Sequence, residues 1–289
     1  MQLKHPDKVL FPDAGYSKQD LADYYAAVSE PLLAQAAGRP LTLRRFPDGI
    51  GKEGFFQQHH RGDLPEGLPA QPAPTADGED EIVHITVASA DGLKALADMA
   101  TLELHGWLAR APKLDQPDRL VFDLDPPNGE FDAVREAARR VAALMDDLGL
   151  VPHLMTTGSR GLHVLAPLTP SMDFHGVREL AKGMAHRLAE RYPDSLTIAQ
   201  RKDKRSGRLY LDIMRNAYGQ SAVLPYSPRA KPGAPVATPL DWDELAGLED
   251  ARAYNIKSIP RRLAQKADPW ADIDRAQADP KAVRSALAR

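Results

Sequence analysis

The sequence contains no cysteine among its 289 residues. This absence excludes a disulfide framework, a zinc site built on thiolates and a cysteine nucleophile. Long hydrophobic runs are also missing: no stretch approaches the roughly 20 apolar residues of a membrane-spanning helix, and the start MQLKHPDKVL has no signal-peptide core. The composition predicts a cytoplasmic protein with no membrane partner, and its chemistry must come from oxygen, nitrogen or a metal.

The chain has no excess of either charge sign. It carries 37 Lys and Arg against 40 Asp and Glu, which gives a net charge of −3 at pH 7. With 43% apolar residues, this balance is typical of a folded globular protein and not of a disordered polyelectrolyte. Any site for nucleic acid must therefore be a local patch.

Helix and strand patterns are mixed along the chain. Apolar residues at helical spacing from Leu21 to Leu32 predict a helix that Ser17 caps and Gly38 ends. The mixture predicts an α/β or α+β fold with a central sheet. The other predicted elements are an exposed loop or hairpin tip at 65–81, strands at 82–87, 119–125 and 209–214, helices at 92–103, 134–148 and 174–191, a strand and turn at 153–168, and a proline-rich surface stretch at 225–239.

Two carboxylates follow each other at the end of a predicted strand. Alternation places Asp123 and Asp125 on one face, and Pro126 and Pro127 then end the pairing. Neighbouring carboxylates repel each other and raise one pKa unless a cation lies between them, and a hard divalent ion is the natural cation. The alternative is a solvated strand end with no metal.

A third carboxylate, Asp212, interrupts the apolar strand LYLDIM. Aspartate is depleted in strand interiors, so Asp212 needs either a metal or an arginine such as Arg208 or Arg215. If Asp212 converges with the other two acids, three carboxylates can hold two metal ions about 4 Å apart, an arrangement that suits phosphoryl transfer.

A glycine-rich turn, GSRGLH, lies between the acidic strands. Its glycines permit close approach of the backbone to a ligand, and Ser159 and Arg160 offer donors to a phosphate. His163 shares a face with Ser159 if the segment is extended. A run of basic residues that includes Arg205 leads into the strand of Asp212, where a polyphosphate would need countercharge. Each feature alone also fits an ordinary turn or a solvated loop.

Together, FDLDPP, GSRGLHV and LYLDIMRNAYGQSAVLPYSPRA resemble the three motifs of the archaeo-eukaryotic primase superfamily, in particular the polymerase domain of bacterial DNA ligase D. The opening segments HPDKVLFPDAGYSKQDLADYY and GRPLTLRRFPDGI resemble that family too. The resemblance implies one primase-polymerase domain over 1–289 with a central mixed or antiparallel, RRM-like sheet flanked by helices. Its expected parts are an N-terminal α/β subregion at 1–115, a catalytic core at 116–240 and a C-terminal helical extension at 241–289.

The same resemblance assigns roles to single residues. It implies that Asp123, Asp125 and Asp212 are catalytic and hold two divalent ions, Mn²⁺ or Mg²⁺. An incoming NTP or dNTP is then bound by Ser159, Arg160, His163, Arg205 and Arg229. DNA with a gap or 3′ overhang is held at its 5′-phosphate by Lys8 and Lys18 and stacked on Phe55 and Phe56. His105 also matches a family histidine.

The function that this resemblance implies is template-directed nucleotide addition during bacterial non-homologous end joining, with a preference for ribonucleotides and an association with the nucleoid. A KxDG ligase motif is absent from the sequence, so the expected partners are Ku and a separate ATP-dependent DNA ligase. Two alternatives stay open. One is a non-catalytic module that bridges DNA ends, and the other is a phosphatase of the haloacid dehalogenase type, although Pro127 stands where that family needs Thr.

Overall fold

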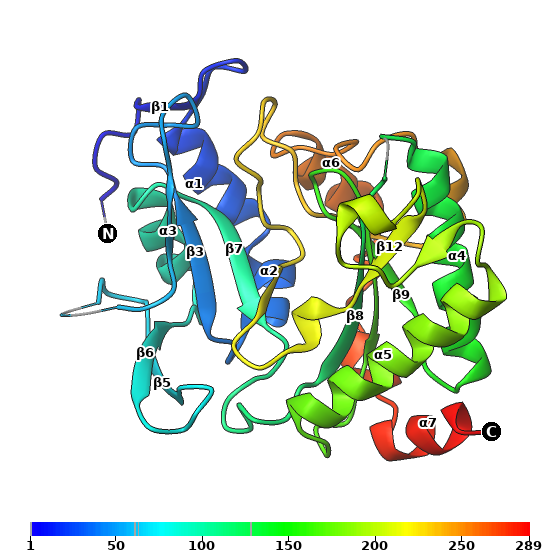
Figure 1. Ribbon diagram of the computed structural model, residues 1–289. Coiled ribbons are helices and arrows are strands. Elements are labelled where there is room, and N and C mark those ends of the chain that lie inside the picture. Colours follow the sequence, from blue (N-terminus) through cyan, green and yellow to red (C-terminus); the bar gives the residue numbers. More distant parts are fainter. Residues whose placement is uncertain (1, 61, 63, 128) are drawn as a thin grey trace.

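The structure, a computed structural model, describes residues 2–60, 62, 64–127 and 129–289. Two sheets lie side by side at its centre (Figure 1). The N-terminal sheet is antiparallel, with the order β13-β7-β3-β6-β5 and with β4 paired to β3. Its strands are β3 Leu41–Arg45, β4 Phe55–Gln57, β5 Ala70–Pro74, β6 Glu81–Ile85, β7 Thr101–Trp107 and β13 Ser221–Val223.

The second sheet, which we call the core sheet, is mixed and has the order β11-β12-β8-β10-β9-β14. Only the pair of β11 and β12 is parallel among its described pairs. The predicted central mixed or antiparallel sheet is therefore confirmed. Its strands are β8 Arg119–Leu124, β9 His153–Thr156, β10 Leu162–Pro167, β11 Leu196–Thr197, β12 Leu209–Asp212 and β14 Pro239–Leu240.

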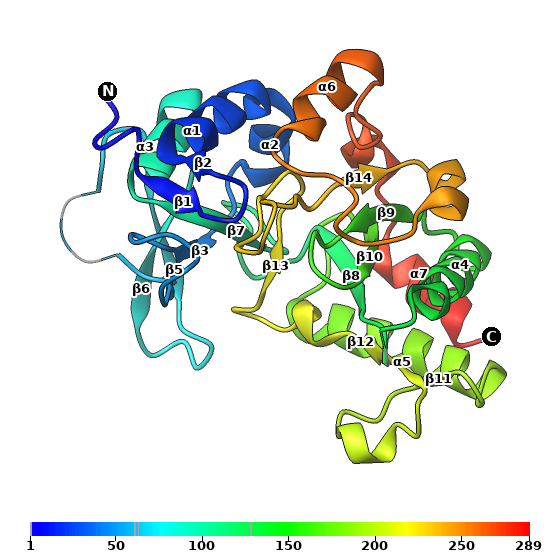
Figure 2. The same ribbon diagram turned by 90° about the horizontal axis from the view of Figure 1, so that it is seen from above.

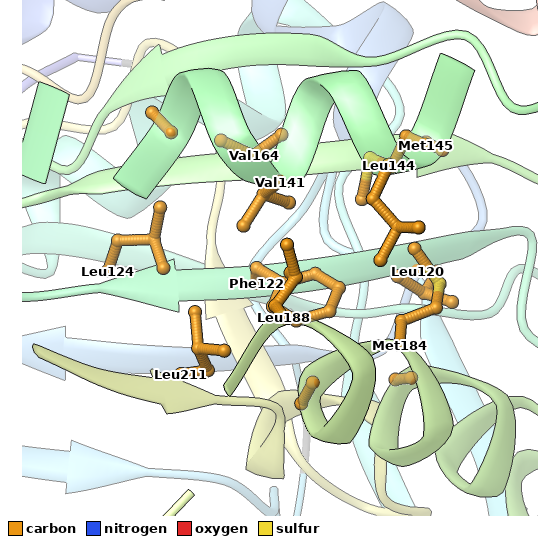
Figure 3. Packing of buried hydrophobic residues seen from close by; sticks show 14 of the residues in the cluster. Leu120, Phe122, Leu124, Val141, Leu144, Met145, Val164, Met184, Leu188 and Leu211 are labelled. Atoms are coloured by element: carbon orange, nitrogen blue, oxygen red, sulfur yellow. The ribbon is translucent and has the colours of Figure 1, made fainter. Parts of the chain in front are cut away.

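Helices cover the outer faces of both sheets (Figure 2). Alternation along β8 turns Leu120, Phe122 and Leu124 toward α4 (Phe131–Asp147) and α5 (Phe174–Arg191), as Figure 3 shows. The opposite face of β8, with Val121, enters a different apolar cluster, so Asp123 faces away from the helices. The remaining helices are α1 Lys18–Ala27, α2 Ser29–Ala36, α3 Ala90–Asp98, α6 Ser258–Gln265 and α7 Pro280–Leu287, and β1 Val9–Phe11 pairs with β2 Tyr16–Ser17.

Several predicted boundaries are corrected by the structure. Ser17 caps α1 through a capping box with Asp20, but the predicted helix breaks at Val28, and Gly38 follows the second helix with φ +70°. The predicted helix at 92–103 ends at Asp98. A turn at Ala100 with φ +53° then starts β7, which is held between β3 and β13 by pairings remote in sequence. The segment at 65–81, predicted as an exposed loop or hairpin tip, contains strand β5, which forms a hairpin with β6.

The proline-rich stretch at 225–239 is not a surface segment. It leaves the N-terminal sheet after β13 and enters the core sheet as β14, and Figure 1 shows it passing between the two. Ser227, Val236 and Thr238 have no exposed surface. Its polar backbone groups pair within the stretch, as Tyr226 N does with Ala237 O, and with β9, as Thr238 O does with Thr156 N. Burial is therefore possible without a strand over its whole length.

A buried ion pair also joins the two sheets. The guanidinium of Arg39, which precedes β3, donates two hydrogen bonds of 2.8 and 2.7 Å to the carboxylate of Asp118, which precedes β8. Only 1% of the Arg39 side chain and 9% of the Asp118 side chain are exposed. Burial by itself would raise the pKa of Asp118, but Arg39 and Arg119 outweigh it and lower that pKa.

Asp118→Asn keeps the side-chain shape but leaves the Arg39 guanidinium without its countercharge. Because an unpaired buried charge is costly, we expect the free energy of unfolding to fall by about 3 to 5 kcal/mol. Urea denaturation measures this loss. Asp250→Asn is the matched control, since Asp250 pairs with Arg252 at the surface, and such pairs contribute less than about 1 kcal/mol. Equal losses in the two variants would show that the Arg39 pair does not stabilise the fold.

Candidate active site

Two of the predicted catalytic acids lie directly opposite each other. β12 pairs with β8 in a register that places Asp212 against Asp123, and opposed side chains on neighbouring strands share one face of a sheet. Asp125 follows one residue beyond the end of β8. The structure therefore places Asp123 and Asp212 side by side on one face of the core sheet, with Asp125 just beyond the end of β8. The alternation of the sequence predicts only that Asp123 and Asp125 share a face, and the pairing of β12 with β8 adds Asp212.

A histidine and an arginine contact the Asp123 carboxylate. His163 on β10 lies opposite Asp123 in the ladder, and its Nε2 is 3.4 Å from Asp123 Oδ1. Arg215, in the 3₁₀ helix η2 (Met214–Asn216), places its Nε 3.3 Å from Asp123 Oδ2. Burial would raise the pKa of Asp123, but His163 and then Arg215 hold it at about 2. Asp123 is therefore ionised at neutral pH.

Asp212 has the opposite electrostatic environment. Burial, and after it the negative charge of Asp123, raise its pKa. Its Oδ1 accepts a hydrogen bond of 2.8 Å from the Met214 N–H, which opposes that rise only in part. A cation between the two carboxylates would relieve their repulsion, so the donor set fits a hard divalent ion.

The three acids line a cleft of about 460 Å³. Its other walls carry cations from the GSRG turn and the basic run, namely Arg160, Lys202, Arg205 and Arg215. An adjoining hollow of about 220 Å³ shares Asp123 and Asp125 with this cleft and is lined also by His105, Ser159, His163 and Arg229. Every residue that the sequence assigns to the metals or the nucleotide therefore lies around one connected space.

Glycines fix the backbone of the GSRG turn against its neighbours. Gly158 has φ +63°, and a Cβ there would lie 2.7 Å from the backbone of Val236. A Cβ on Gly161 would lie 1.9 Å from the carbonyl oxygen of Leu124, at the end of β8. Only glycine allows the turn to pack this closely, and the close packing places Arg160 where it hydrogen bonds to Asp125.

The predicted arginines differ in how far their donors are already used. Arg205 donates to the carbonyl oxygens of Ala199 and Gln200 and lies 4.4 Å above the ring of Tyr210. Arg229 donates to Thr157 O, beside the glycine turn. Both form part of the walls of the cleft and its adjoining hollow, and their positions are set by these contacts.

Glu103 is a buried acid that the sequence reading missed. It is 1% exposed, forms ion pairs with Arg44 at 3.0 Å and Arg229 at 3.3 Å, and is hydrogen bonded to His105 Nε2 at 3.0 Å. Burial would raise its pKa, yet His105 and Arg229 lower it to about 2. Its signal is the alternating segment LELHGW, in which Glu103 and His105 share a face of a strand, but the helix predicted over 92–103 concealed this pattern.

The predicted DNA-end residues lie on the N-terminal part of the molecule, and the ring of Phe56 is 6.3 Å from that of His105 in the hollow beside the acids. Phe55 and Phe56 on β4 are 46% and 60% exposed, and the guanidinium groups of Arg45 and Arg44 lie 5.2 and 5.3 Å from their ring centroids. Such exposure is unusual for phenylalanine and is typical of a binding surface.

Lys8 and Lys18 are neighbours in the backbone, since Lys18 N donates to Lys8 O. Their ammonium groups already have partners. Lys8 Nζ is 2.7 Å from Asp48 Oδ1, and Lys18 Nζ donates to Asp98 O at 2.8 Å. The Lys18 side chain is only 7% exposed, whereas that of Lys8 is 39% exposed. Lys8 is thus the more accessible of the two, and the 5′-phosphate role of both stays a prediction.

A known family model matches most of the chain. Residues 17–270 match the family model described as LigD, primase-polymerase domain. The chain belongs to the LigD primase-polymerase domain family. That membership confirms the resemblance in the three motifs. It excludes the alternative of a phosphatase of the haloacid dehalogenase type.

Individual relatives of the chain support this assignment to the LigD family. The chain is 36% identical over 276 residues to the multifunctional non-homologous end joining protein LigD of Pseudomonas aeruginosa, covering 94% of this chain and 32% of that protein. It is 28% identical to the bifunctional LigD protein of Bacillus subtilis, covering 95% of this chain and 44% of that protein. The chain thus spans about a third to under half of the length of these relatives.

The solved polymerase domain of Mycobacterium tuberculosis ligase D, in complex with DNA, has the same fold as this LigD-type chain. The two superpose with a TM-score of 0.88 at 33% identity, over 96% of this chain and 99% of the other.

Among the residues that the structure describes, no helix has the length and apolar character needed to cross a bilayer.

Stability at acidic pH should depend on Glu103. Its folded pKa is lowered to about 2 from a usual value of 4.5. It therefore stabilises the fold fully above pH 4.5, and this contribution, roughly 3 kcal/mol, is lost as the pH falls toward 2. We expect Glu103→Gln to be less stable than wild type at pH 7, with a difference that shrinks below pH 4.5.

Urea unfolding at several pH values between 3 and 7 measures this difference. Glu249→Gln is the control, because Glu249 is exposed and its replacement should give a small difference that does not change with pH. Parallel pH profiles for wild type and Glu103→Gln would show that the ion pairs of Glu103 do not stabilise the folded state.

Proposed function

We propose that this chain is a template-directed nucleotidyltransferase that extends 3′ ends and fills gaps in broken DNA during bacterial non-homologous end joining. The observation that carries the proposal is the opposition of Asp123 and Asp212 in a cleft whose other walls are cationic. Membership of the LigD primase-polymerase family and the DNA-bound Mycobacterium tuberculosis relative support it.

In this proposal Asp123, Asp125 and Asp212 hold two divalent ions, Mg²⁺ or Mn²⁺. When bound, such ions activate a 3′-hydroxyl and stabilise the oxygen of the leaving pyrophosphate. The donor set supports this role, since all three side chains are oxygen ligands and the raised pKa of Asp212, a result of burial and of Asp123, reflects uncompensated negative charge.

Ser159, Arg160, His163, Arg205 and Arg229 bind the triphosphate of an incoming NTP or dNTP. Arg160 is the side chain most able to move toward it, because 66% of that side chain is exposed and its described partner is Asp125. His163, in addition to this role, and Arg215 lower the pKa of Asp123 and keep it ionised. Arg229 is held by Thr157 and Glu103 beside the turn, which fixes its orientation before the nucleotide binds.

The same proposal includes a preference for ribonucleotides, recognition of a downstream 5′-phosphate by Lys8 and Lys18, and stacking of template bases on Phe55 and Phe56. It also includes action in the cytoplasm on nucleoid DNA, with Ku and an ATP-dependent ligase as partners. One domain over 1–289 carries these functions, with DNA-end contacts in 1–115, chemistry in 116–240 and a helical extension in 241–289. The names of the relatives support the end-joining context.

Asp123→Asn and Asp212→Asn each remove one negative charge from the metal site. We expect either change to reduce primer extension at least about a hundredfold, which is about 2.7 kcal/mol of barrier, while binding to gapped DNA stays within about twofold. Extension of a labelled primer with Mg²⁺ or Mn²⁺ measures the rate, and competition between rNTP and dNTP in the same assay tests the sugar preference.

Asp243→Asn is the matched control for this experiment, because Asp243 is an exposed acid in the cluster with Asp241 and Glu244, outside the cleft. A variant at Asp123 that retains more than about a tenth of the wild-type rate would contradict a role as a metal ligand. Absence of extension by the wild-type protein would favour the alternative of a non-catalytic module that bridges DNA ends.

Recognition of a 5′-phosphate is tested at Lys8, the accessible lysine of the pair. We expect wild type to bind gapped DNA with a downstream 5′-phosphate more tightly than the same DNA without it, and Lys8→Ala to lose most of this difference. Asp48→Asn frees the Lys8 ammonium from its ion pair and should increase the difference. Lys182→Ala, at an exposed lysine paired with Glu179, is the control, and a 5′-phosphate effect that is unchanged in Lys8→Ala would refute the role.

A further inference from the structure

A second hollow lies on the N-terminal sheet, beside the β5–β6 hairpin. It has a volume of about 140 Å³, and we call it the ring pocket because four rings line it: His59, His84, Trp107 and Tyr218. His84 and Trp107 are 5% and 3% exposed. The buried rings provide its floor, and the more exposed residues provide its rim, which includes Gln58 and Thr75.

The rings of this pocket contact one another edge to face. The centroid of His84 is 5.6 Å from that of His59 and 5.0 Å from that of Trp107, and Tyr218 lies 5.1 Å from Trp107. The Tyr218 hydroxyl donates to Pro74 O at 2.8 Å, which joins the hairpin to the turn after η2. Contacts on several sides hold the rings in place, so the pocket is preformed.

The chemistry of the lining favours an uncharged aromatic ligand. None of its described lining residues is Lys, Arg, Asp or Glu, so it offers no countercharge for a phosphate. Burial lowers the pKa of His84 to about 4, so this ring is neutral at pH 7. The Nδ1 atom of His84 has no hydrogen-bond partner among the described residues, and Thr42 and Gln58 add further polar groups. Aromatic surface beside an unpaired ring nitrogen and further polar side chains suits a nucleobase.

The ring pocket shares a face of the N-terminal sheet with two parts of the proposed DNA path, namely the hollow beside the acids and the ring of Phe56. Alternation along β7 places His105 and Trp107 on one face, and His105 lines the hollow beside the acids. Alternation along β3 places Thr42 of the pocket beside Arg44, whose guanidinium lies at the ring of Phe56. Residues two apart on a strand are about 7 Å apart. The pocket therefore lies next to Phe56, whereas Phe55, paired with Arg45, lies on the opposite face of the sheet.

We propose that the ring pocket binds the base of one unpaired nucleotide of the DNA strand that crosses this face, beside the base stacked on Phe56. The inference rests on the proposed function, because that function brings single-stranded DNA to the N-terminal sheet. The pocket adds a second contact to the DNA strand, through a base and without any phosphate contact. It therefore selects DNA ends that carry unpaired nucleotides over blunt ends.

The test measures binding to a duplex with a single-stranded 3′ overhang in which one position at a time is abasic. We expect two sensitive positions in the wild-type protein, each with a loss of about 5- to 150-fold in affinity, the range of one stacked base. Tyr218→Ala and His59→Ala should remove the penalty at one of these positions. Phe56→Ala should remove it at the other.

Two controls separate loss of the ring from other effects. Tyr218→Phe retains the ring and loses only the bond to Pro74, so the abasic profile should match wild type. His175→Ala changes an exposed histidine on α5, outside the pocket, and should also match. Thermal unfolding of every variant identifies any that fails to fold, and His59, being exposed, gives the variant least prone to misfolding.

If Tyr218→Ala and His59→Ala both keep the full wild-type abasic profile, the ring pocket does not bind a base. Primer extension by the same preparations separates this outcome from failure of the proposed function: extension by wild type with an unchanged profile in the variants refutes the pocket alone. A wild-type protein that neither extends nor binds the overhang overturns both.

Discussion

Repulsion between Asp123 and Asp212 is the constraint on which the site depends. The register of β8 with β12 forces the two carboxylates together, and burial prevents water from screening them. The fold compensates one of them with His163 and Arg215 and leaves the other with a raised pKa, as burial and Asp123 require. The strand order β12-β8-β10 is therefore a requirement of the chemistry as well as of packing, because β10 supplies the histidine.

Charge compensation also explains how the two sheets are joined. Arg39 and Asp118 form a buried pair where each sheet begins, and Glu103 connects Arg44, under Phe56, to Arg229, beside the glycine turn. These pairs are surrounded by apolar clusters, so each charge is costly unless its partner stays in place. The two sheets thus keep a fixed relation, and the surface that carries Phe56 is held in register with the acidic cleft.

In the proposed function, this arrangement would link DNA binding and nucleotide addition on one face. His105 on β7 lines the hollow beside the acids, while Trp107 on the same strand lines the ring pocket. A DNA strand bound along the N-terminal sheet would therefore lie close to the acids. The low net charge of −3 fits such a surface, since specific contacts through rings and a few cations replace a broad basic patch.

The sequence by itself determined the features that depend on local pattern. Alternation in LVFDLD predicts that Asp123 and Asp125 share a face, Ser17 predicts the start of α1, and the glycines of GSRG predict a close turn. The motifs, read together, were enough to identify the family. These features depend on backbone geometry and residue type over a few neighbours, and such information is present in a short segment.

Only the tertiary structure decided the features that depend on distant partners. β7 is a strand because β3 and β13 pair with it, although residues 92–103 have a helical pattern. The stretch at 225–239 is buried because it links two sheets, and Lys18 is buried because Asp98, 80 residues away, accepts its hydrogen bonds. The network of Glu103 and the ring pocket have the same origin. Pairing and burial of this kind come from contacts between segments remote in sequence, so no local pattern specifies them.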